Sequence, residues 1–157
     1  AKTKLEGEKI VLNSSIPTLV IRTNFFGMGR PWHPSFSDWL LNAITNNINL
    51  NIFSDVYFSP IALKYLCPII TDIIKKNGRG VYHVAGNERL SKYHFAKLLA
   101  QMAGYTCNTL NKTSIAKAGL RAPRPTDMSL NTQKVQEFLG HEMPNIETSL
   151  TSLFEKN

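Results

Sequence analysis

Apolar residues recur at the three- and four-residue spacing of an amphipathic helix along much of this chain. One such run places Phe36, Trp39, Leu40, Ala43 and Ile44 on a single helix face. Together with their polar borders, these runs predict helices over residues 2–13, 36–45, 59–76, 91–103, 131–139 and 146–154. Helices are therefore expected to supply most of the regular structure.

Two short apolar runs break the helical spacing and favour extended chain. Thr18–Arg22 and Val81–Ala85 show no alternation of polar and apolar positions. Such runs are typical of strands that are covered on both faces in a parallel sheet. The stretch from Leu50 to Tyr57 has room for one or two further short strands, and residues 105–130 predict irregular structure. The expected fold class is α/β, mostly helical, with two buried parallel strands.

Capping residues set the predicted ends of several helices. The Ser59-Pro60 pair has the form of a helix start, a hydroxyl cap followed by proline in the first turn. Pro68 falls inside the same helix and should kink it. Ser91 is the expected cap of the next helix, and Gly140 is the expected end of the helix after that.

The composition narrows the class of protein. The chain has 157 residues, of which 43% are hydrophobic, as expected for one globular domain with a core. No apolar stretch is as long as a membrane-spanning helix, and the first residues lack the apolar segment of a signal peptide. We therefore expect a cytoplasmic protein with no membrane partner. Cys67 and Cys107 are expected to be buried free thiols.

The net charge of +7 admits two classes of partner, nucleic acid or small anions such as phosphates. The lysines and arginines are scattered, which is typical of a solvated surface, and no aromatic and basic platform for single strands is visible. We therefore expect no nucleic-acid partner. A nucleic-acid-binding module is the rival hypothesis, and a steep salt dependence of binding would reveal it.

Common site signatures are absent from the sequence. It contains no glycine-rich dinucleotide fingerprint, phosphate-binding loop, serine-hydrolase elbow or zinc-protease motif. The four histidines, His33, His83, His94 and His141, include no pair with metal-ligand spacing on a shared face. We expect them to be structural or surface residues, and we expect no metal site.

Five sequence blocks occur in the order found in one family of oxidoreductases. The blocks are Lys2–Glu8, Leu19–Gly27, Phe58–Pro60, Gly80–Gly86 and Arg124–Lys134. They resemble the run after the catalytic tyrosine, the sixth sheet strand with its loop, a helix start, the last sheet strand and a C-terminal run of extended short-chain dehydrogenases/reductases. Their order and spacing are most similar to the dTDP-4-dehydrorhamnose reductases.

The resemblance implies a cofactor site for NADPH or NADH. Lys4 matches the lysine of the family's Tyr-x-x-x-Lys motif, whose tyrosine would lie one position before Ala1. That lysine holds cofactor ribose hydroxyls and lowers the pKa of the tyrosine from its usual value of about 10. Lys4 is therefore expected to be catalytic and cofactor-binding. Thr23, Asn24 and Phe25 are further expected cofactor-binding residues, at the carboxyl end of a strand, where α/β sheets bind ligands.

The same resemblance implies a site for a nucleotide-sugar substrate. Its expected residues are Phe26, Trp32, Ser59 and Arg124. Arg124 would meet a diphosphate with its planar guanidinium group, and Trp32 would stack on the ligand or act as a lid. At least one of Phe25 and Phe26 is expected to pack in the core.

The resemblance also implies how the chain is organised. Residues 1–157 are expected to hold the last part of a Rossmann-type fold interleaved with the substrate-binding domain, without the N-terminal dinucleotide-binding half. The implied function is reduction of a 4-keto nucleotide sugar in deoxysugar and cell-surface polysaccharide biosynthesis, and we expect this chain alone to be inactive. A homo-oligomer is expected, since the strands at 18–22 and 81–85 would leave a bare sheet edge. Open alternatives are a nucleotide-sugar epimerase or dehydratase, or a non-catalytic homologue like the regulatory subunit of methionine adenosyltransferase.

Overall fold

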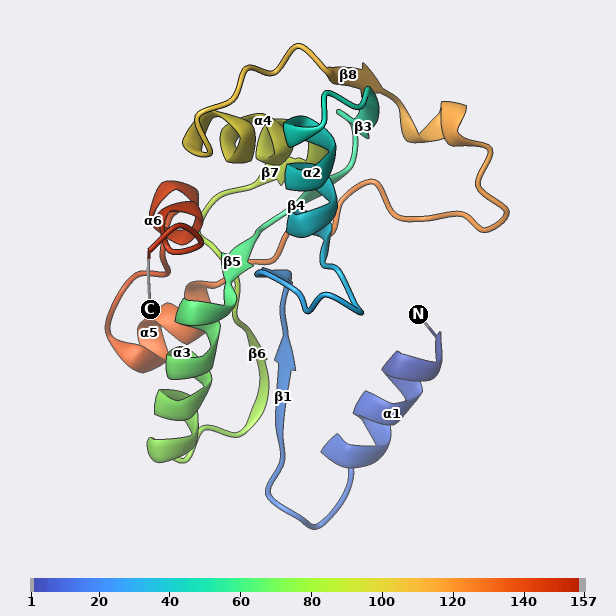
Figure 1. Ribbon diagram of the computed structural model, residues 1–157. Coiled ribbons are helices and arrows are strands. Elements are labelled where there is room, and N and C mark those ends of the chain that lie inside the picture. The colour runs from blue at the N-terminus through green and yellow to red at the C-terminus, as the bar shows by residue number, and fades with distance from the viewer. Residues whose placement is uncertain (1, 156–157) are drawn as a thin grey trace.

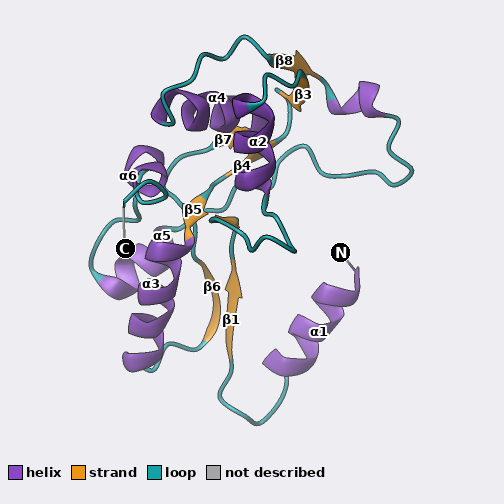
Figure 2. Ribbon diagram, viewed as in Figure 1, coloured by secondary structure: helices purple, strands orange, loops and turns teal. Residues whose placement is uncertain are grey.

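A computed structural model describes residues 2–155 and shows helices and short strands in an α/β arrangement (Figure 1). The helices are α1 (Lys2–Leu12), α2 (Phe36–Thr45), α3 (Leu63–Lys75), α4 (Lys92–Met102), α5 (Gln133–Leu139) and α6 (Ile146–Thr151), with a 3-10 helix at Ile115–Ala118. The strands are β1 (Leu19–Arg22), β2 (Phe25–Phe26), β3 (Leu50–Phe53), β4 (Tyr57–Phe58), β5 (Ile61–Ala62), β6 (Gly80–His83), β7 (Leu90–Ser91) and β8 (Leu110–Thr113). Figure 2 shows how short these strands are beside the helices and loops.

Strands β1 and β6 form a parallel pair, with Leu19 opposite Gly80 and Arg22 opposite His83. A parallel pair needs a long crossover connection, and residues 23–79 supply it with α2 and α3. Three smaller pairs complete the strands: β2 with β5 and β3 with β8 are parallel, and β4 with β7 is antiparallel. The predicted α/β class and the parallel pairing of the two predicted strands are confirmed.

The apolar side chains pack into two clusters. In the first, α3 and α5 cover β6, and the residues Leu66, Tyr82 and Val135 are buried between them. In the second, α2, α4 and α6 pack with β3 and β8 around Phe95, which is fully buried. Tyr65 of α3 packs against both clusters. The first cluster thus supports the central strand pair, and the second supports the loop that follows β1.

Helix α1 stands beside β1 and buries none of its side chains (Figure 1). Its apolar residues Leu5, Ile10, Val11 and Leu12 are all exposed. Strand β1 is consequently only half-buried from Leu19 to Ile21. The prediction that this strand is covered on both faces was wrong, because α1 buries no side chain against it.

The Ser59-Pro60 pair does not start a helix, contrary to the sequence-based expectation. Strand β5 follows it and pairs with β2, so α3 begins only at Leu63. The N-cap position of α3 is Ala62, which has no side-chain cap. The Ser59 N–H instead donates to Asn24 Oδ1 at 3.1 Å. Pairing with a distant strand therefore outweighs the local helix signal.

The buried face of α2 is rotated relative to the predicted one. Its buried residues are Ser37, Leu40, Ala43 and Ile44, whereas Trp39 is 45% exposed. The helix begins where predicted because Ser35 caps it in a capping box with Asp38. The rotation brings the serine at position 37 into the interior.

Three further expectations need correction or qualification. The segment 105–130 is not wholly irregular, because Leu110 is buried and β8 pairs with β3. Cys67 and Cys107 are free thiols, but Cys67 is exposed on α3 and Cys107 is only partly buried. Helix α6 ends at Thr151, before the apolar residues at 153 and 154. Within residues 2–155, no helix combines the length and apolar character needed to cross a bilayer.

Candidate functional site

Two pockets adjoin at the carboxyl end of β1. The α1 pocket, of about 800 Å³, is lined by Lys4, Glu8, Val20–Asn24 and Asp127–Leu130. The loop pocket, of about 550 Å³, is lined by Asn24–Gly29, His33–Ser37, Phe58, Leu63, Lys92 and Met128. Asn24 and Met128 line both pockets. Because ligands of α/β folds bind at the carboxyl ends of parallel strands, we treat the two pockets as one candidate site.

Asn24 fixes the boundary between the two pockets. Its Oδ1 accepts a hydrogen bond from the Ser59 N–H at 3.1 Å, and its backbone oxygen accepts one from the Ile61 N–H at 3.2 Å. Its Nδ2 donates to the Thr23 carbonyl at 3.3 Å. The side chain therefore ties the end of β1 to the segment before α3, which holds the wall between the pockets in place.

Lys4 and Thr23 face the α1 pocket together. Lys4 comes from the first turns of α1 and is exposed, and Thr23 follows β1 and is partly buried. The Thr23 hydroxyl oxygen is buried and has no hydrogen-bond partner within residues 2–155. Leaving a buried polar atom unsatisfied costs about 1–3 kcal/mol. A polar ligand group in the α1 pocket would remove this cost.

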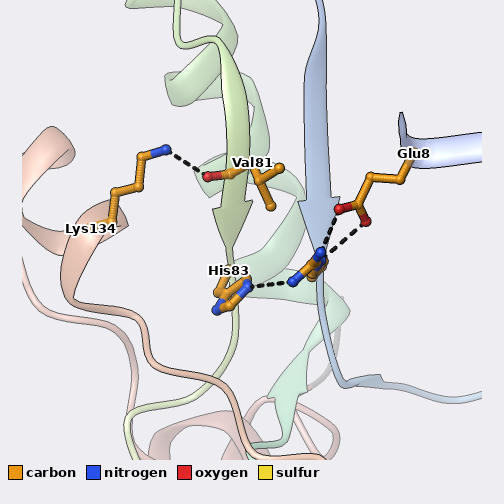
Figure 3. A network of polar contacts seen from close by, with 5 residues as sticks. Glu8, Val81, His83 and Lys134 are labelled. Atoms are coloured by element: carbon orange, nitrogen blue, oxygen red, sulfur yellow. Dashed lines mark hydrogen bonds and ion pairs between the residues drawn. The ribbon is translucent and has the colours of Figure 1, made fainter. Parts of the chain in front are cut away.

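A charged network fixes α1 against β1 beside the α1 pocket (Figure 3). Arg22 donates from Nε to Glu8 Oε2 at 3.1 Å and from Nη2 to Glu8 Oε1. Its Nη1 lies 3.4 Å from His83 Nε2. The hydrogen bond from Arg22 lowers the pKa of the Glu8 carboxyl, so Glu8 is an anion at neutral pH. On β6, the Val81 carbonyl accepts a hydrogen bond from Lys134 Nζ at 2.7 Å.

Asp127 belongs to the α1 pocket but was not singled out from the sequence. Its Oδ1 accepts hydrogen bonds from the Ser129 hydroxyl at 2.6 Å and the Ser129 N–H at 2.9 Å. Its Oδ2 accepts one from Arg89 Nε at 2.9 Å, and the Arg89 guanidinium lies over the Tyr57 ring. Hydrogen bonds from Ser129 and Arg89 lower the pKa of Asp127 to about 2. The sequence signal for Asp127 is the Asp-x-Ser spacing, because an aspartate side chain that bonds to the residue two positions later is typical of a turn.

The two phenylalanines after β1 have different environments. Phe26 is 5% exposed, and its ring meets the Phe95 ring edge-on at 5.0 Å between centroids. Phe25 is 59% exposed. Both line the loop pocket. The expectation that at least one of them packs in the core is confirmed for Phe26, which leaves Phe25 as the ring free to contact a ligand.

The loop before α2 is held by hydrogen bonds to the first turn of that helix. The Asp38 carboxylate accepts bonds from the Gly29 N–H at 2.6 Å and the Ser35 N–H at 2.7 Å. Burial alone would raise the pKa of Asp38, but the bonds from Ser35 and Gly29 hold it below its usual value. A Cβ on Gly29 would lie 2.5 Å from the His33 carbonyl oxygen. The turn therefore requires glycine at this position.

Lys92, the first residue of α4, places its ammonium group in the loop pocket. Its Nζ lies 3.3 Å from the centroid of the Phe58 ring and 5.0 Å from that of the Phe36 ring. Burial lowers the pKa of Lys92 to about 8. No sequence motif singles out this residue. Its position directly after the Ser91 cap, on a helix with an apolar face, was the only available signal.

Three predicted substrate residues lie outside both pockets. Ser59 is buried, and its hydroxyl accepts a hydrogen bond from the Leu130 N–H at 3.3 Å. Trp32 is 76% exposed, with the Arg30 guanidinium 5.5 Å from its ring centroid. Arg124 lines a separate hollow of about 290 Å³ made by residues 115–124. The structure therefore groups Lys4, Thr23, Asn24, Phe25 and Phe26 around the two pockets but does not add these three. No cluster of three or more histidine, cysteine or acidic residues suited to a metal occurs within residues 2–155.

Comparison with known proteins identifies relatives along the whole chain. The family model of the RmlD substrate binding domain matches residues 1–157. The dTDP-4-dehydrorhamnose reductase of Salmonella typhimurium is 26% identical over 167 residues, covering 98% of this chain and 55% of that protein. The enzyme of the same name from Escherichia coli is 25% identical over 154 residues, covering 92% of this chain and 51% of that protein. The chain thus spans about half the length of the curated relatives it matches.

The fold is shared with solved reductase structures. The dTDP-4-dehydrorhamnose reductase from Bacillus anthracis, solved in complex with NADP, aligns with a TM-score of 0.87 at 22% identity, over 98% of this chain and 53% of that chain. The match in fold confirms the expected α/β fold class and its likeness to the reductase fold. Since the family model covers the full sequence, the chain belongs to the RmlD substrate binding domain family.

Proposed function

We propose that this chain supplies the substrate-binding part of an NADPH- or NADH-dependent reductase that acts on a 4-keto nucleotide sugar. The observation that carries the proposal is the meeting of two pockets at Asn24, one lined by Lys4 and Thr23 and the other by Phe25. Relatives named dTDP-4-dehydrorhamnose reductase support this reading, and one of them was solved with NADP. The substrate proposed here is therefore of the dTDP-4-dehydrorhamnose type.

The residues of the α1 pocket fit the cofactor. Thr23 offers a buried hydroxyl that lacks a partner within residues 2–155, and Lys4 offers an exposed ammonium group on the same pocket. A hydroxyl and a cation suit the ribose hydroxyls and the amide of a nicotinamide nucleotide. When bound, the nicotinamide supplies a hydride to the ketone carbon of the sugar.

Lys4 would have two tasks in this site. Its ammonium group would donate hydrogen bonds to ribose hydroxyls and so orient the cofactor. It would also stabilise the phenolate of the motif tyrosine, which lies outside this sequence, and so lower its pKa for proton donation near neutral pH. Glu8 does not pair with Lys4, since its carboxylate forms an ion pair with Arg22. The ion pair between Glu8 and Arg22 would thus keep the α1 face that carries Lys4 turned to the pocket.

The loop pocket would hold the sugar and part of the nucleotide. The exposed ring of Phe25 offers an apolar face to a sugar ring, and the loop from Gly27 to Ser37 would shield the reacting carbon from water. The polar groups of this pocket are few, which suits a ligand oriented by a small number of hydrogen bonds.

Binding and turnover test the proposal separately. In a titration of the isolated chain followed by amide NMR, dTDP-rhamnose should shift residues 24–37, and free rhamnose should not. The isolated chain should show no turnover of dTDP-4-dehydrorhamnose with NADH or NADPH, since its sequence holds no glycine-rich dinucleotide turn. The full reductase that includes this chain should turn it over. Binding without turnover by that full protein would favour a non-catalytic homologue, and absence of binding at millimolar ligand would refute the substrate assignment.

A further inference from the structure

The ammonium group of Lys92 has an unusual setting for a lysine. It lies against two aromatic rings, those of Phe36 and Phe58, in a pocket whose lining contains no acidic residue. Burial is the sole cause of its lowered pKa, so no carboxylate within residues 2–155 stabilises the charged form. Buried charges are normally paired, because desolvation is costly. The rings offset part of that cost, and an anion brought by a ligand would offset the rest.

The first turn of α2 lines the same pocket with further donors. In the capping box, the Asp38 N–H donates to Ser35 Oγ at 3.1 Å, and the Ser35 N–H donates to the Asp38 carboxylate. The N–H groups of Phe36 and Ser37 have no intrahelical acceptor, as in any first helical turn. Both residues line the loop pocket. The N-terminal end of a helix favours anions through these donors and its partial positive charge.

The hydroxyl of Ser37 is a further polar group of the loop pocket without a partner within residues 2–155. Ser37 is 0% exposed and lines the loop pocket, and its Oγ has no hydrogen-bond partner within residues 2–155. The negative charge nearest to this helix end is Asp38, which does not line the pocket and is occupied by Gly29 and Ser35. The negative charge of Asp38 therefore weakens the attraction for an anion, but the N–H groups of Phe36 and Ser37 remain without an intrahelical acceptor.

We propose that Lys92, the Ser37 hydroxyl and the Phe36 and Ser37 amides form an oxyanion-binding subsite of the loop pocket. This inference rests on the proposed function only in treating the loop pocket as a ligand site. The oxyanion has two possible sources in a nucleotide sugar, the diphosphate or a carboxylate on the sugar. Lys92 is then a residue that selects substrates by charge, since an uncharged ligand would leave its ammonium group unpaired.

Calorimetric titration of the isolated chain tests the subsite with two probes, dTDP and D-glucuronate. The first probe carries a diphosphate with no second sugar attached to it. The second probe is a sugar that carries a carboxylate and no phosphate. Lys92→Met should weaken binding of the recognised probe at least tenfold, about 1.4 kcal/mol. Ser37→Ala should weaken it several-fold, and Lys92→Arg should retain most of the affinity. Lys97→Met removes an exposed lysine on the same helix and should change nothing.

The outcomes separate the subsite from the proposed function. Lys92-dependent binding of dTDP alone assigns the oxyanion to the diphosphate, and Lys92-dependent binding of glucuronate alone assigns it to a sugar carboxylate. Equal binding by the wild type, Lys92→Met and Lys92→Arg would overturn the subsite, as would failure of both probes to bind at millimolar concentration. If Lys92→Met leaves the KM of the full reductase for its nucleotide sugar unchanged, the subsite is refuted and the proposed function stands. If a probe binds in a Lys92-dependent way but the full protein has no reductase activity, the subsite is supported and the proposed function is contradicted.

Discussion

Arg22 of β1 holds Glu8 of α1 through both carboxylate oxygens. Helix α1 buries no side chain of its own, and this ion pair joins it to β1. Lys4 lies one helical turn before Glu8, on the same side of the helix, and faces the α1 pocket with it. The position of the proposed catalytic lysine therefore depends on a contact made by a different residue.

Glu8→Gln should loosen α1 without unfolding the rest of the chain. The amides of residues 5–12 should exchange faster with deuterium, and those of α3 and α4 should keep their protection. Because the pKa of Glu8 is lowered in the folded state, its contribution is present above the unfolded-state value of about 4.5 and is lost as the pH falls through the folded-state value. Acidification of the wild type should thus reproduce the effect of Glu8→Gln. Unchanged exchange in α1 would show that the pair does not hold the helix.

Lys4→Ala in the full reductase that includes this chain should lower kcat/KM by more than tenfold. The substitution removes a cofactor contact and the cation beside the motif tyrosine, and tenfold corresponds to about 1.4 kcal/mol. Lys2→Ala is a matched control, because Lys2 is exposed on the same helix but does not line the α1 pocket. Steady-state assays with both variants give the comparison. A loss smaller than tenfold, or an equal loss with Lys2→Ala, would argue against the role of Lys4.

Lys92→Met should stabilise the chain at pH 7 by about 1–2 kcal/mol after allowance for solvent screening. The pKa of Lys92 is about 8 in the folded state against 10.5 as the unperturbed value, so the unfolded state binds more protons between these pH values. Stability from this group therefore rises with pH across that window, and the charged form costs stability below it. In urea unfolding, the advantage of Lys92→Met should shrink between pH 8 and pH 10. A stability difference between Lys92→Met and the wild type that is the same at all pH values would contradict this prediction. The control Lys97→Met should show no pH-dependent change in stability.

Gly29→Ala should disturb the loop pocket because the added Cβ meets backbone atoms. It would lie 2.5 Å from the His33 oxygen and 2.6 Å from the Ser35 nitrogen, which a side-chain rotation cannot relieve. We expect a loss of about 1–3 kcal/mol in stability, as for overpacked sites, and weaker binding of dTDP-rhamnose. Gly7→Ala in α1 has no atom within 4 Å of its Cβ and should stabilise slightly. Thermal unfolding and NMR titration of the two variants provide the test.

The sequence predicted the elements whose signals are local. Helix α4 follows from its apolar spacing and from Ser91, whose hydroxyl accepts the His94 N–H at 3.1 Å. Strands β1 and β6 follow from short apolar runs. The two-residue strand β5 was missed, because its partner β2 lies 36 positions earlier, at Phe25 opposite Ile61. A strand that exists only through such a pairing has no local signal to compete with the helix start at Ser59.

The candidate site was predictable only as far as the family resemblance extends. The resemblance placed Lys4, Thr23 and Phe25 on what proved to be the two adjoining pockets. It gave no reason to select Lys92 or Ser37. Their chemistry arises from burial and from the absence of a partner within residues 2–155, which are properties of the packed molecule.

Within the described part of the chain, the edge of β1 opposite β6 is open. Strand β1 pairs with β6 alone within residues 2–155, so its other edge presents unpaired backbone groups. Beside it, α1 exposes Ile10 at 71% and Val11 at 42%. Unpaired edges and contiguous apolar surface favour association between chains.

The isolated chain should therefore form a dimer or larger oligomer through α1 and the free edge of β1. Sedimentation equilibrium at micromolar concentration should show a mass above that of the monomer, and deuterium exchange in β1 should slow as concentration rises. Ile10→Lys should shift the equilibrium to monomer, since it places a charge on the proposed interface. Ile74→Lys is the control, because Ile74 is 60% exposed on α3 and lies outside that surface. A stable monomer whose β1 amides exchange at the same rate at every concentration would refute this prediction. That result would show that the open edge of β1 does not pair with a second chain.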